Sequence, residues 1–197
     1  MRHTVLVLLA ALGLCGTTVC AQRGAYTAAT DLDQMVSQAR NILRGHVVSA
    51  KVEPHPQFSN LQTVVVTLKV DRVLKGTATA TYTFRQYIWD PRDVADAAGY
   101  RKRDELLLFL NPASLYDLTS PVGMEQGRFR VERDATGTGT AVNGRGNAGL
   151  FTGVTGKAAA RGISLSAQAR VMLSQGSGRV SLAMFEETVQ ALAGAAK

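Results

Sequence analysis

Residues 105–134, ELLLFLNPASLYDLTSPVGMEQGRFRVERD, contain the pattern that decides the fold. Positions 106–110 are apolar without interruption, which is typical of a strand buried on both faces, and an Asn-Pro pair then ends it. In residues 127–133 two apolar side chains alternate with charged ones, as in a strand with one face in water. The stretch therefore predicts two strands of a small β-rich domain, joined by a long loop at residues 113–126.

Three further strands are predicted on the N-terminal side of this stretch. The clearest lies in residues 63–74, where valines and a leucine occupy every second position. Residues 79–89 alternate in the same way, and residues 42–52 carry two central valines. Gly45 in that first strand permits a bulge or a close crossing of two strands. In chain order these strands predict an antiparallel meander.

Helices are predicted on both sides of the β pattern. Thr30 can cap a short helix, because apolar residues follow it at the i, i+3, i+4 and i+7 positions of one helix face. Ser166 and Ser181 can cap two more helices near the C-terminus. Between the β pattern and these helices, the glycine-rich residues 153–165 are predicted to be a mobile surface linker.

Together these patterns predict a mainly β fold, a small antiparallel OB-like barrel of five or six strands. A short N-terminal helix packs on the barrel, and a helical tail ends the chain. The predicted organisation is a signal peptide at 1–21, a β-barrel domain with its helix at 22–152, the linker at 153–165 and a C-terminal helical extension at 166–197.

The first 21 residues have the features of a secretory signal peptide. Arg2 precedes a short apolar run, and Val19-Cys20-Ala21 forms a small-residue cleavage pattern. The run is shorter than the approximately 20 residues that a membrane anchor needs, and no later stretch approaches that length. We therefore expect an exported protein, periplasmic or extracellular, with no transmembrane segment after cleavage. Lipidation is a minor alternative, because Leu14 and Val19 stand where a lipoprotein signal requires a small residue.

The residue types that remain after cleavage exclude several chemistries. Cys15 and Cys20 are the only cysteines and both lie in the leader, so the mature chain has no disulfide, thiol nucleophile or thiolate ligand. His46 and His55 have no acidic cluster close by in sequence, so no metal or cofactor is predicted. A Ser-His-Asp triad stays open, since its members need not be adjacent, although no G-x-S-x-G motif supports one.

Residues 144–149, GRGNAG, match the dinucleotide-binding pattern G-x-G-x-x-G. That pattern binds a dinucleotide only where it leaves a strand and opens a helix within a βαβ unit. Here it follows an Asn-Gly pair that is typical of a hairpin turn. We therefore predict a surface turn in place of a nucleotide site.

The charge of the chain is unevenly distributed. Lysine and arginine number 22 against 15 acidic residues, a formal net charge of +7, and residues 127–179 hold eight of the basic residues and two acidic ones. A basic surface on an exported protein favours anionic partners, either acidic polymers, lipid headgroups or the acidic face of another protein. The alternative is a charge that only keeps the protein soluble. No specific nucleic acid is expected.

A candidate ligand-binding face lies along the predicted strand at residues 79–89. Arg85, Tyr87 and Trp89 fall on one side of it and could form an aromatic and basic surface on an OB-like barrel. Arg128 and Arg130, on the wet face of the strand at 127–133, extend the basic part of this candidate site. Half-buried aromatic residues of an ordinary strand are the alternative.

Several segments, taken as a set, resemble a group of uncharacterised exported bacterial proteins. They are GHVV at 45–48, VDRVLKG at 70–76, ELLLFL at 105–110 and VGMEQGRFRV at 122–131, and the resemblance covers roughly residues 30–151. It implies a small OB-like barrel, similar in outline to netrin-like and tissue-metalloprotease-inhibitor modules. Those inhibitors present an N-terminal cysteine to the protease metal. The mature chain has none, so that mechanism does not carry over. The resembled group has no assigned activity, so it implies no functional residue here.

The patterns support three functional hypotheses. The first is an exported, non-enzymatic binding module, because a good β pattern is combined with no recognisable catalytic constellation. The second is a hydrolase whose site is assembled around the loop at 113–126, since long ordered loops often carry sites, although such a loop can equally close a barrel. The third is a protein that binds anionic polymers or lipid headgroups through the basic residues of 127–179.

Overall fold

The computed structural model describes residues 27–194 of the 197-residue chain. The predicted signal peptide with its two cysteines lies outside the described residues, as do the last three residues of the predicted C-terminal extension. The elements in order are α2 (Leu32–Gln38), β1 (Asn41–His55), β2 (Phe58–Lys75), β3 (Thr81–Tyr87), the 3-10 turns η1 (Pro91–Val94) and η2 (Ala97–Gly99), β4 (Glu105–Leu110), η3 (Met124–Gln126), β5 (Arg128–Arg133), β6 (Gly139–Asn143), α3 (Val154–Ala160), α4 (Ala167–Leu173), β7 (Val180–Ser181) and α5 (Leu182–Gly194).

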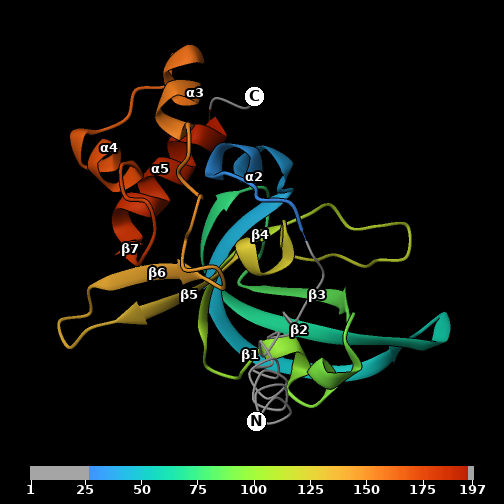
Figure 1. Ribbon diagram of the computed structural model, residues 1–197. Coiled ribbons are helices and arrows are strands. Elements are labelled where there is room, and N and C mark those ends of the chain that lie inside the picture. The colour runs from blue at the N-terminus through green and yellow to red at the C-terminus, as the bar shows by residue number, and fades with distance from the viewer. Residues whose placement is uncertain (1–26, 195–197) are drawn as a thin grey trace, which may run out of the picture.

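The strands form one antiparallel sheet in the order β3-β2-β1-β4-β5-β6-β7 (Figure 1). This confirms the predicted mainly β fold, the N-terminal helix and the C-terminal helices. The predicted barrel is corrected to an open sheet, because β3 and β7 are its two ends and do not pair with each other. The count of five or six strands is also exceeded, since β7 adds a short strand that the sequence pattern did not indicate.

The long loop after β4 lies between β4 and the free edge of β3. Single bridges join Leu118 to Arg85 of β3 and Pro121 to Leu110 of β4. The backbone N–H of Thr119 donates to the carbonyl of Arg85 at 2.8 Å, which fixes the loop against the strand edge. The loop therefore covers part of the edge of β3 and links it to β4, and the open sheet is barrel-like only in this loose sense.

The middle strand, β4, is buried on both faces, as its uninterrupted apolar run predicts. All six of its residues are buried. Leu107 and Phe109 belong to a core on the helix side of the sheet, whereas Leu106, Leu108 and Leu110 belong to a second core enclosed by β1, β2 and β3. Each face of β4 thus has its own hydrophobic layer, which is why no polar residue interrupts the run.

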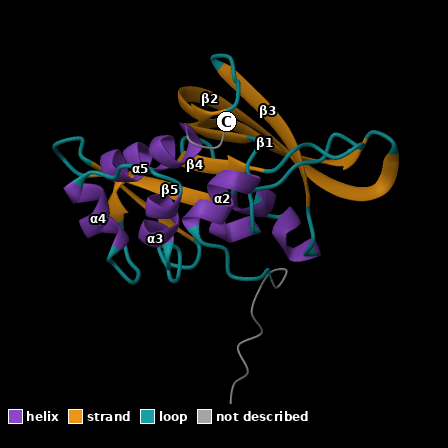
Figure 2. Ribbon diagram, turned by 90° about the horizontal axis from the view of Figure 1, so that it is seen from above, coloured by secondary structure: helices purple, strands orange, loops and turns teal. Residues whose placement is uncertain are grey.

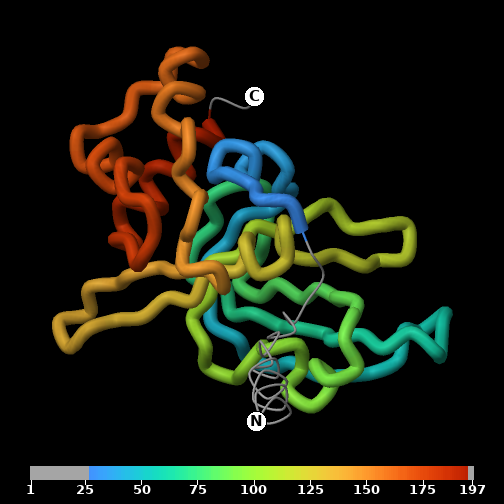
Figure 3. The backbone as a smooth tube through the Cα atoms, in the orientation of Figure 1, coloured from blue at the N-terminus to red at the C-terminus, as the bar shows by residue number. Residues whose placement is uncertain are grey.

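The four α-helices within residues 27–194 gather on one side of the sheet (Figure 2). The chain trace shows the C-terminal helical segments returning to lie beside α2 at the start of the described chain (Figure 3). Lys157 of α3 donates to Asp31, the N-cap residue of α2, at 2.5 Å, and Arg161 pairs with Asp33. The first helix and the C-terminal helices of the described chain therefore share one core.

The predicted linker at 153–165 is corrected by this packing. It contains α3, whose Val154 and Ala158 are fully buried in the core on the helix side, together with Leu165. Glycine content suggested a mobile segment, but the apolar residues between the glycines are spaced to face that core. The segment 166–194 likewise packs on the sheet through α5 and is not a separate tail.

The N-cap of α2 and Gly45 of β1 are two places where a prediction concerned a single residue. The first helix is capped by Asp31, one residue later than the predicted Thr30, because its carboxylate accepts from the N–H of Gln34 in a capping box. Gly45 does mark a close crossing, since an added Cβ would lie 2.2 Å from the carbonyl oxygen of Lys69.

Within residues 27–194, no helix combines the length and apolar character needed to cross a membrane.

Candidate ligand-binding pocket

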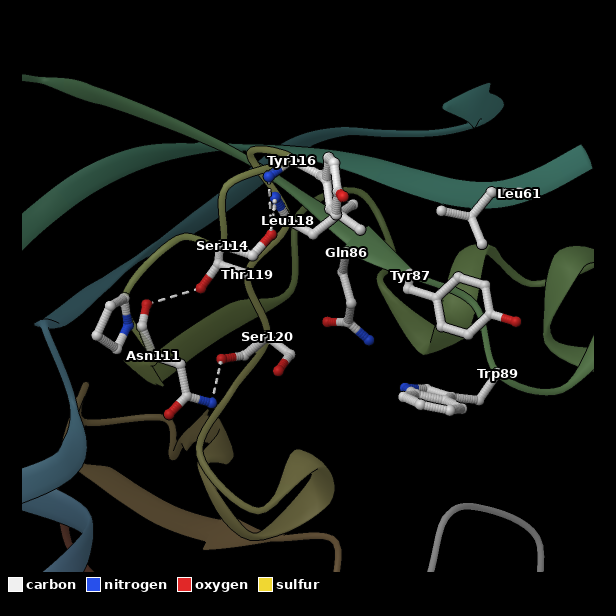
Figure 4. A pocket seen from close by; sticks show the side chains of 11 residues that line it. Leu61, Gln86, Tyr87, Trp89, Asn111, Ser114, Tyr116, Leu118, Thr119 and Ser120 are labelled. Atoms are coloured by element: carbon white, nitrogen blue, oxygen red, sulfur yellow. Dashed lines mark hydrogen bonds between the residues drawn. The ribbon is translucent and has the colours of Figure 1, made fainter. Parts of the chain in front are cut away.

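A pocket of about 410 Å³ lies where the end of β3 meets the loop after β4 (Figure 4). That volume falls within the range of roughly 300–1,000 Å³ that is typical of small-molecule sites. The lining comes from the middle of the sequence and from three separate segments. It consists of Leu61 on β2, Gln86 and Tyr87 on β3, Trp89 after β3, and Asn111, Pro112, Ser114, Tyr116, Leu118, Thr119 and Ser120 on the loop.

The rim of the pocket is aromatic and exposed. Trp89 is 62% exposed and stands edge-on to Tyr87, with ring centroids 4.8 Å apart, while Tyr116 is 53% exposed on the loop. Leu115, fully exposed, is next to Tyr116, and Phe58 packs edge-on against the Tyr116 ring at 5.1 Å. Of the six large hydrophobic residues that are exposed within the described chain, four gather here. Such a concentration on one face is typical of a binding surface.

Gln86 is the buried polar group of the pocket. Its side chain is on the core-facing side of β3, is 5% exposed, and points into the pocket in Figure 4. Its Oε1 accepts the hydroxyl proton of Tyr100 at 2.7 Å. Burial raises the pKa of Tyr100 to about 12, so this hydroxyl keeps its proton and can donate it to Gln86 Oε1. The Nε2 donor then faces the pocket and has no partner among the described residues.

The loop wall is held in place by hydrogen bonds of its own. Ser114 Oγ accepts from the backbone N–H groups of Tyr116 and Leu118, each at 3.2 Å, and Asn111 Nδ2 donates to the carbonyl of Ser120 at 3.1 Å. Thr119 Oγ1 donates to the carbonyl of Asn111 at 2.7 Å. Because these bonds order the loop without a ligand, its wall of the pocket is largely preformed.

His55 anchors the loop to the β1–β2 hairpin. The N–H of Gln57 donates to its Nδ1, so Nε2 carries the proton and donates to the carbonyl of Tyr116 at 2.9 Å. The imidazole also stacks on Phe58, with ring centroids 5.2 Å apart. Both nitrogens are thus engaged in backbone contacts, and His55 holds the rim without a free nitrogen for proton transfer.

The lining carries no ionisable acid or base other than the two tyrosines. None of the residues that line the pocket in the described chain is aspartate, glutamate, histidine, lysine, arginine or cysteine. Hydroxyl and amide groups of this kind can form hydrogen bonds, but an activated nucleophile needs a base within hydrogen-bond reach. The described lining therefore offers aromatic rings, hydroxyls and amides, and its polar contacts are those of uncharged groups.

The residues of the predicted ligand-binding face are divided by the fold. Tyr87 and Trp89 meet in the pocket. Arg85 turns away from it and donates to Glu53 at 2.7 Å and to Thr63 Oγ1 at 2.8 Å. Arg128 and Arg130 also lie outside the lining. The aromatic half of the predicted face is thus brought together as one site, and the basic half is not.

Arg128 is held by structural contacts outside the pocket lining. Its guanidinium lies over the ring of Tyr100 at 4.7 Å, donates to the carbonyl of Ala98 at 2.6 Å and pairs with Glu125. These contacts pin the polar excursion between β3 and β4 to the sheet. Arg130 is exposed and pairs with no group in the described chain.

Sequence reasoning missed Gln86 as a site residue. A signal for it existed, because Gln86 is a polar residue that alternates with the apolar, core-facing Phe84 and Ile88. For the pocket-lining residues on the loop, the sequence supported only the general hypothesis that residues 113–126 carry a site. Which of its side chains face β3 depends on the bridge at Leu118, and no local pattern predicts that contact.

A second polar cluster lies on the sheet beneath α5. Arg44 of β1 donates to Glu105 of β4 at 2.6 Å and to Glu186 of α5 at 2.7 Å. Arg133 and Arg72 complete the set, donating to Glu105 and Glu186 respectively, each at 2.7 Å. The side chains of the two glutamates are only 7% and 4% exposed. The cluster fixes the last helix to the sheet by charge-assisted hydrogen bonds.

One edge of this cluster contains metal-ligand types. His46, Asp71 and Glu105 each place a ligand atom within 4.8 Å of the others, a group the sequence spacing did not indicate. The carboxylates are already used, however, because Asp71 accepts from His46 at 2.8 Å and Glu105 accepts from two arginines. Arg44 Nη1 also lies 3.7 Å from Asp71 and would repel a cation. We therefore assign the group to the ionic cluster.

The ionic cluster predicts a loss of stability in acid. Burial by itself would raise the pKa of Glu105, but hydrogen bonds from Arg133 and Arg44 outweigh it and hold that pKa below its ordinary value. A depressed native pKa stabilises the fold fully above the unfolded-state value of about 4.3, and this contribution is lost as the pH falls through the native value.

We expect the free energy of unfolding in urea to fall more steeply between pH 5 and about 2 in the parent protein than in Glu105→Gln. The glutamine variant binds no proton at this position, so its difference from the parent should shrink as the pH falls. Two curves that run parallel over the whole range would contradict the assignment.

The basic excess of residues 127–179 is largely compensated in the fold. Five of its eight cations pair with acidic residues: Arg128 with Glu125, Arg133 with Glu105, Lys157 with Asp31, Arg161 with Asp33 and Arg179 with Glu132. Four of these five acids lie outside residues 127–179, so a count of charges within those residues does not reveal that the cations are compensated. The described residues 127–179 therefore do not present a continuous surface of unpaired positive charge.

The GRGNAG segment forms successive turns, as predicted, and no helix opens within it. Its Asn147 is fully buried, and its amide joins β6 to the turn before β7 by donating to the carbonyls of Ala141 and Gly178 at 3.1 and 2.8 Å. The backbone N–H groups of residues 144–148 also donate to Glu125, Asn143 and Arg145, so they are used within the fold and do not form a phosphate cradle on a helix N-terminus.

The fold and the pocket together define a mainly β protein with helices on one side of its open sheet and an uncharged aromatic pocket at the edge strand β3. Comparison of the chain with protein-family models, with curated proteins and with solved structures finds no match. The resemblance to exported bacterial proteins with OB-like barrels stays a prediction.

Proposed function

We propose that this protein is an exported, non-enzymatic binding module whose pocket between β3 and the following loop takes a small uncharged ligand. The observation that carries the proposal is Gln86, a residue only 5% exposed whose side-chain amide points into an aromatic pocket (Figure 4). In the free pocket this donor is open to water, since no buried side-chain nitrogen or oxygen of residues 27–194 lacks a partner. A ligand that displaces the water must supply an acceptor, because a donor left unpaired by the ligand would cost about 1–3 kcal/mol. Export rests on the predicted signal peptide.

The hydrolase hypothesis has less support at this site. The pocket does use the loop on which that hypothesis depends, but its serine and threonine hydroxyls have no carboxylate or imidazole beside them within the described lining. Ser114 Oγ is occupied as an acceptor of two backbone N–H groups. Binding of anionic polymers is also less well supported, because most cations of residues 127–179 already have partners.

Intrinsic fluorescence tests the proposal directly. Trp89 is the single tryptophan of the chain, so the tryptophan emission of the purified protein reports on the rim of this pocket alone. We expect a saturable change in emission with at least one member of a chemically broad panel of small uncharged solutes. The affinity should fall about tenfold in Gln86→Met, which removes one hydrogen bond worth about 1.4 kcal/mol.

A matched variant separates binding from general damage. Gln175→Met makes the same exchange at an exposed glutamine outside the pocket and should bind like the parent. Thermal melts of both variants show whether the fold is retained. If no uncharged solute changes the emission, or if charged solutes bind as well as neutral ones, the proposed function is wrong.

A further inference from the structure

The pocket offers two kinds of surface at different depths. Broad faces of Trp89 and Tyr116 form an exposed apolar rim, and the amides and hydroxyls of Gln86, Asn111 and Ser120 line the interior (Figure 4). A ligand that satisfies both needs an apolar face to pack on a ring and a polar edge that hydrogen-bonds over a short distance. Purely hydrophobic ligands would leave the Gln86 donor buried without a partner.

The free hydrogen-bonding atoms are of mixed type. Gln86 Nε2 is a donor, whereas Asn111 Oδ1 is an acceptor, because the Nδ2 of that residue is committed to the carbonyl of Ser120. Ser120 Oγ can both donate and accept, and like the other two atoms it has no partner among the described residues. Adjacent alcohol hydroxyls, each of which donates and accepts, match such a set. A ligand with acceptors only, such as a carboxylate or phosphate, does not.

We infer that the ligand is a neutral carbohydrate, bound with the C–H face of a pyranose ring against Trp89 and with its hydroxyl edge toward Gln86 and Asn111. A pyranose ring combines an apolar C–H face with a rim of hydroxyl groups, which are the two requirements of the pocket. The uncharged lining favours neutral sugars over uronic, sulfated or phosphorylated ones, since no described lining residue would compensate an anion. This inference rests on the proposed function and names its ligand class.

A peptide is the main competing occupant, and the geometry of β3 argues against it. Extended peptides bind a sheet by adding a strand to a free edge, where backbone N–H and C=O groups are unpaired. Beside the pocket the carbonyl of Arg85 already accepts from Thr119, and the bridge to Leu118 occupies that edge of β3. The loop therefore takes the place that an added strand would need.

Isothermal titration calorimetry and Trp89 fluorescence together test the inference. The probes are uncharged oligosaccharides of glucose, mannose, galactose and N-acetylglucosamine, with oligogalacturonate as the charged counterpart and uncharged tetrapeptides, including a proline-rich one, as the peptide arm. We expect at least one neutral oligosaccharide to bind, and its uronic counterpart to bind at least tenfold more weakly. Binding of a soluble polysaccharide of the same sugar but not of its oligomers would identify a chain of several units as the ligand.

Variants of the rim provide the internal control. By calorimetry, Trp89→Ala should weaken oligosaccharide binding at least tenfold, and Trp89→Phe, which retains an aromatic face, should recover most of the affinity. Val171→Ala, at an exposed apolar residue of α4 outside the pocket, should bind like the parent.

The outcomes separate this inference from the function on which it rests. If peptides or other neutral solutes bind at Trp89 and no neutral saccharide does, the carbohydrate inference is overturned and the binding function stands. Equal binding of neutral and uronic sugars also overturns it. If no uncharged compound of any class binds, both are overturned.

Discussion

Leu108→Asp should prevent the protein from folding. Leu108 is fully buried in β4, the strand between the two cores, and is paired with Leu43 of β1 on one side and Arg128 of β5 on the other. The substitution removes a leucine from the core enclosed by β1, β2 and β3. It puts a carboxylate there in a hydrophobic layer that is not arranged to pair with it. Burial of an unpaired polar group alone costs several kcal/mol, against a total stability of about 5–15 kcal/mol.

A matched control makes this expectation specific to β4. Leu115→Asp is the same exchange at a residue that is 100% exposed, so it should change the stability by less than about 0.5 kcal/mol. Far-ultraviolet circular dichroism and thermal melts of the two purified variants provide the comparison, with soluble yield as a third measurement. A Leu108→Asp protein that melts like the parent would mean that β4 is not the buried centre of the sheet.

Arg44→Met should cost about 3–5 kcal/mol, the next largest effect we expect. Arg44 is hydrogen-bonded to both buried carboxylates of the ionic cluster, Glu105 and Glu186, and so connects the sheet to α5. Methionine keeps much of the length of the side chain but none of its donors. The two glutamates, 7% and 4% exposed, then keep only Arg133 and Arg72 as partners, and both of these are about 40% exposed.

Urea unfolding at neutral pH measures this effect, and an exposed pair calibrates it. Arg179→Met breaks the pair with Glu132, in which both side chains are about half exposed, and should cost no more than about 1 kcal/mol. The double variant Arg44→Met, Glu186→Gln should be more stable than Arg44→Met alone, because it removes one of the uncompensated charges. Equal losses in Arg44→Met and Arg179→Met would contradict a central role for the cluster.

The candidate pocket was only partly predictable from the sequence. The alternation in β3 placed Tyr87 on one side of the strand with Trp89 beyond it, and this aromatic pair does form the rim. The same alternation grouped Arg85 with them, but Arg85 is drawn to Glu53 on β1, two strands away. Periodicity predicts which face of a strand a residue occupies. It does not predict which charged partner from another strand will reach that face.

By itself, the sequence determined the elements whose causes are local. The unbroken apolar run of β4, the alternation along β2 and β3, and the Ser166 cap of α4 each depend on neighbours within a few positions. Only the tertiary structure decided that the sheet stays open, that α3 within residues 153–165 packs against α2, and that Gln86 faces a pocket. Those outcomes depend on contacts between segments far apart in the sequence, such as Lys157 with Asp31, which are 126 residues apart. No local pattern specifies such contacts, because they form only when the whole core assembles.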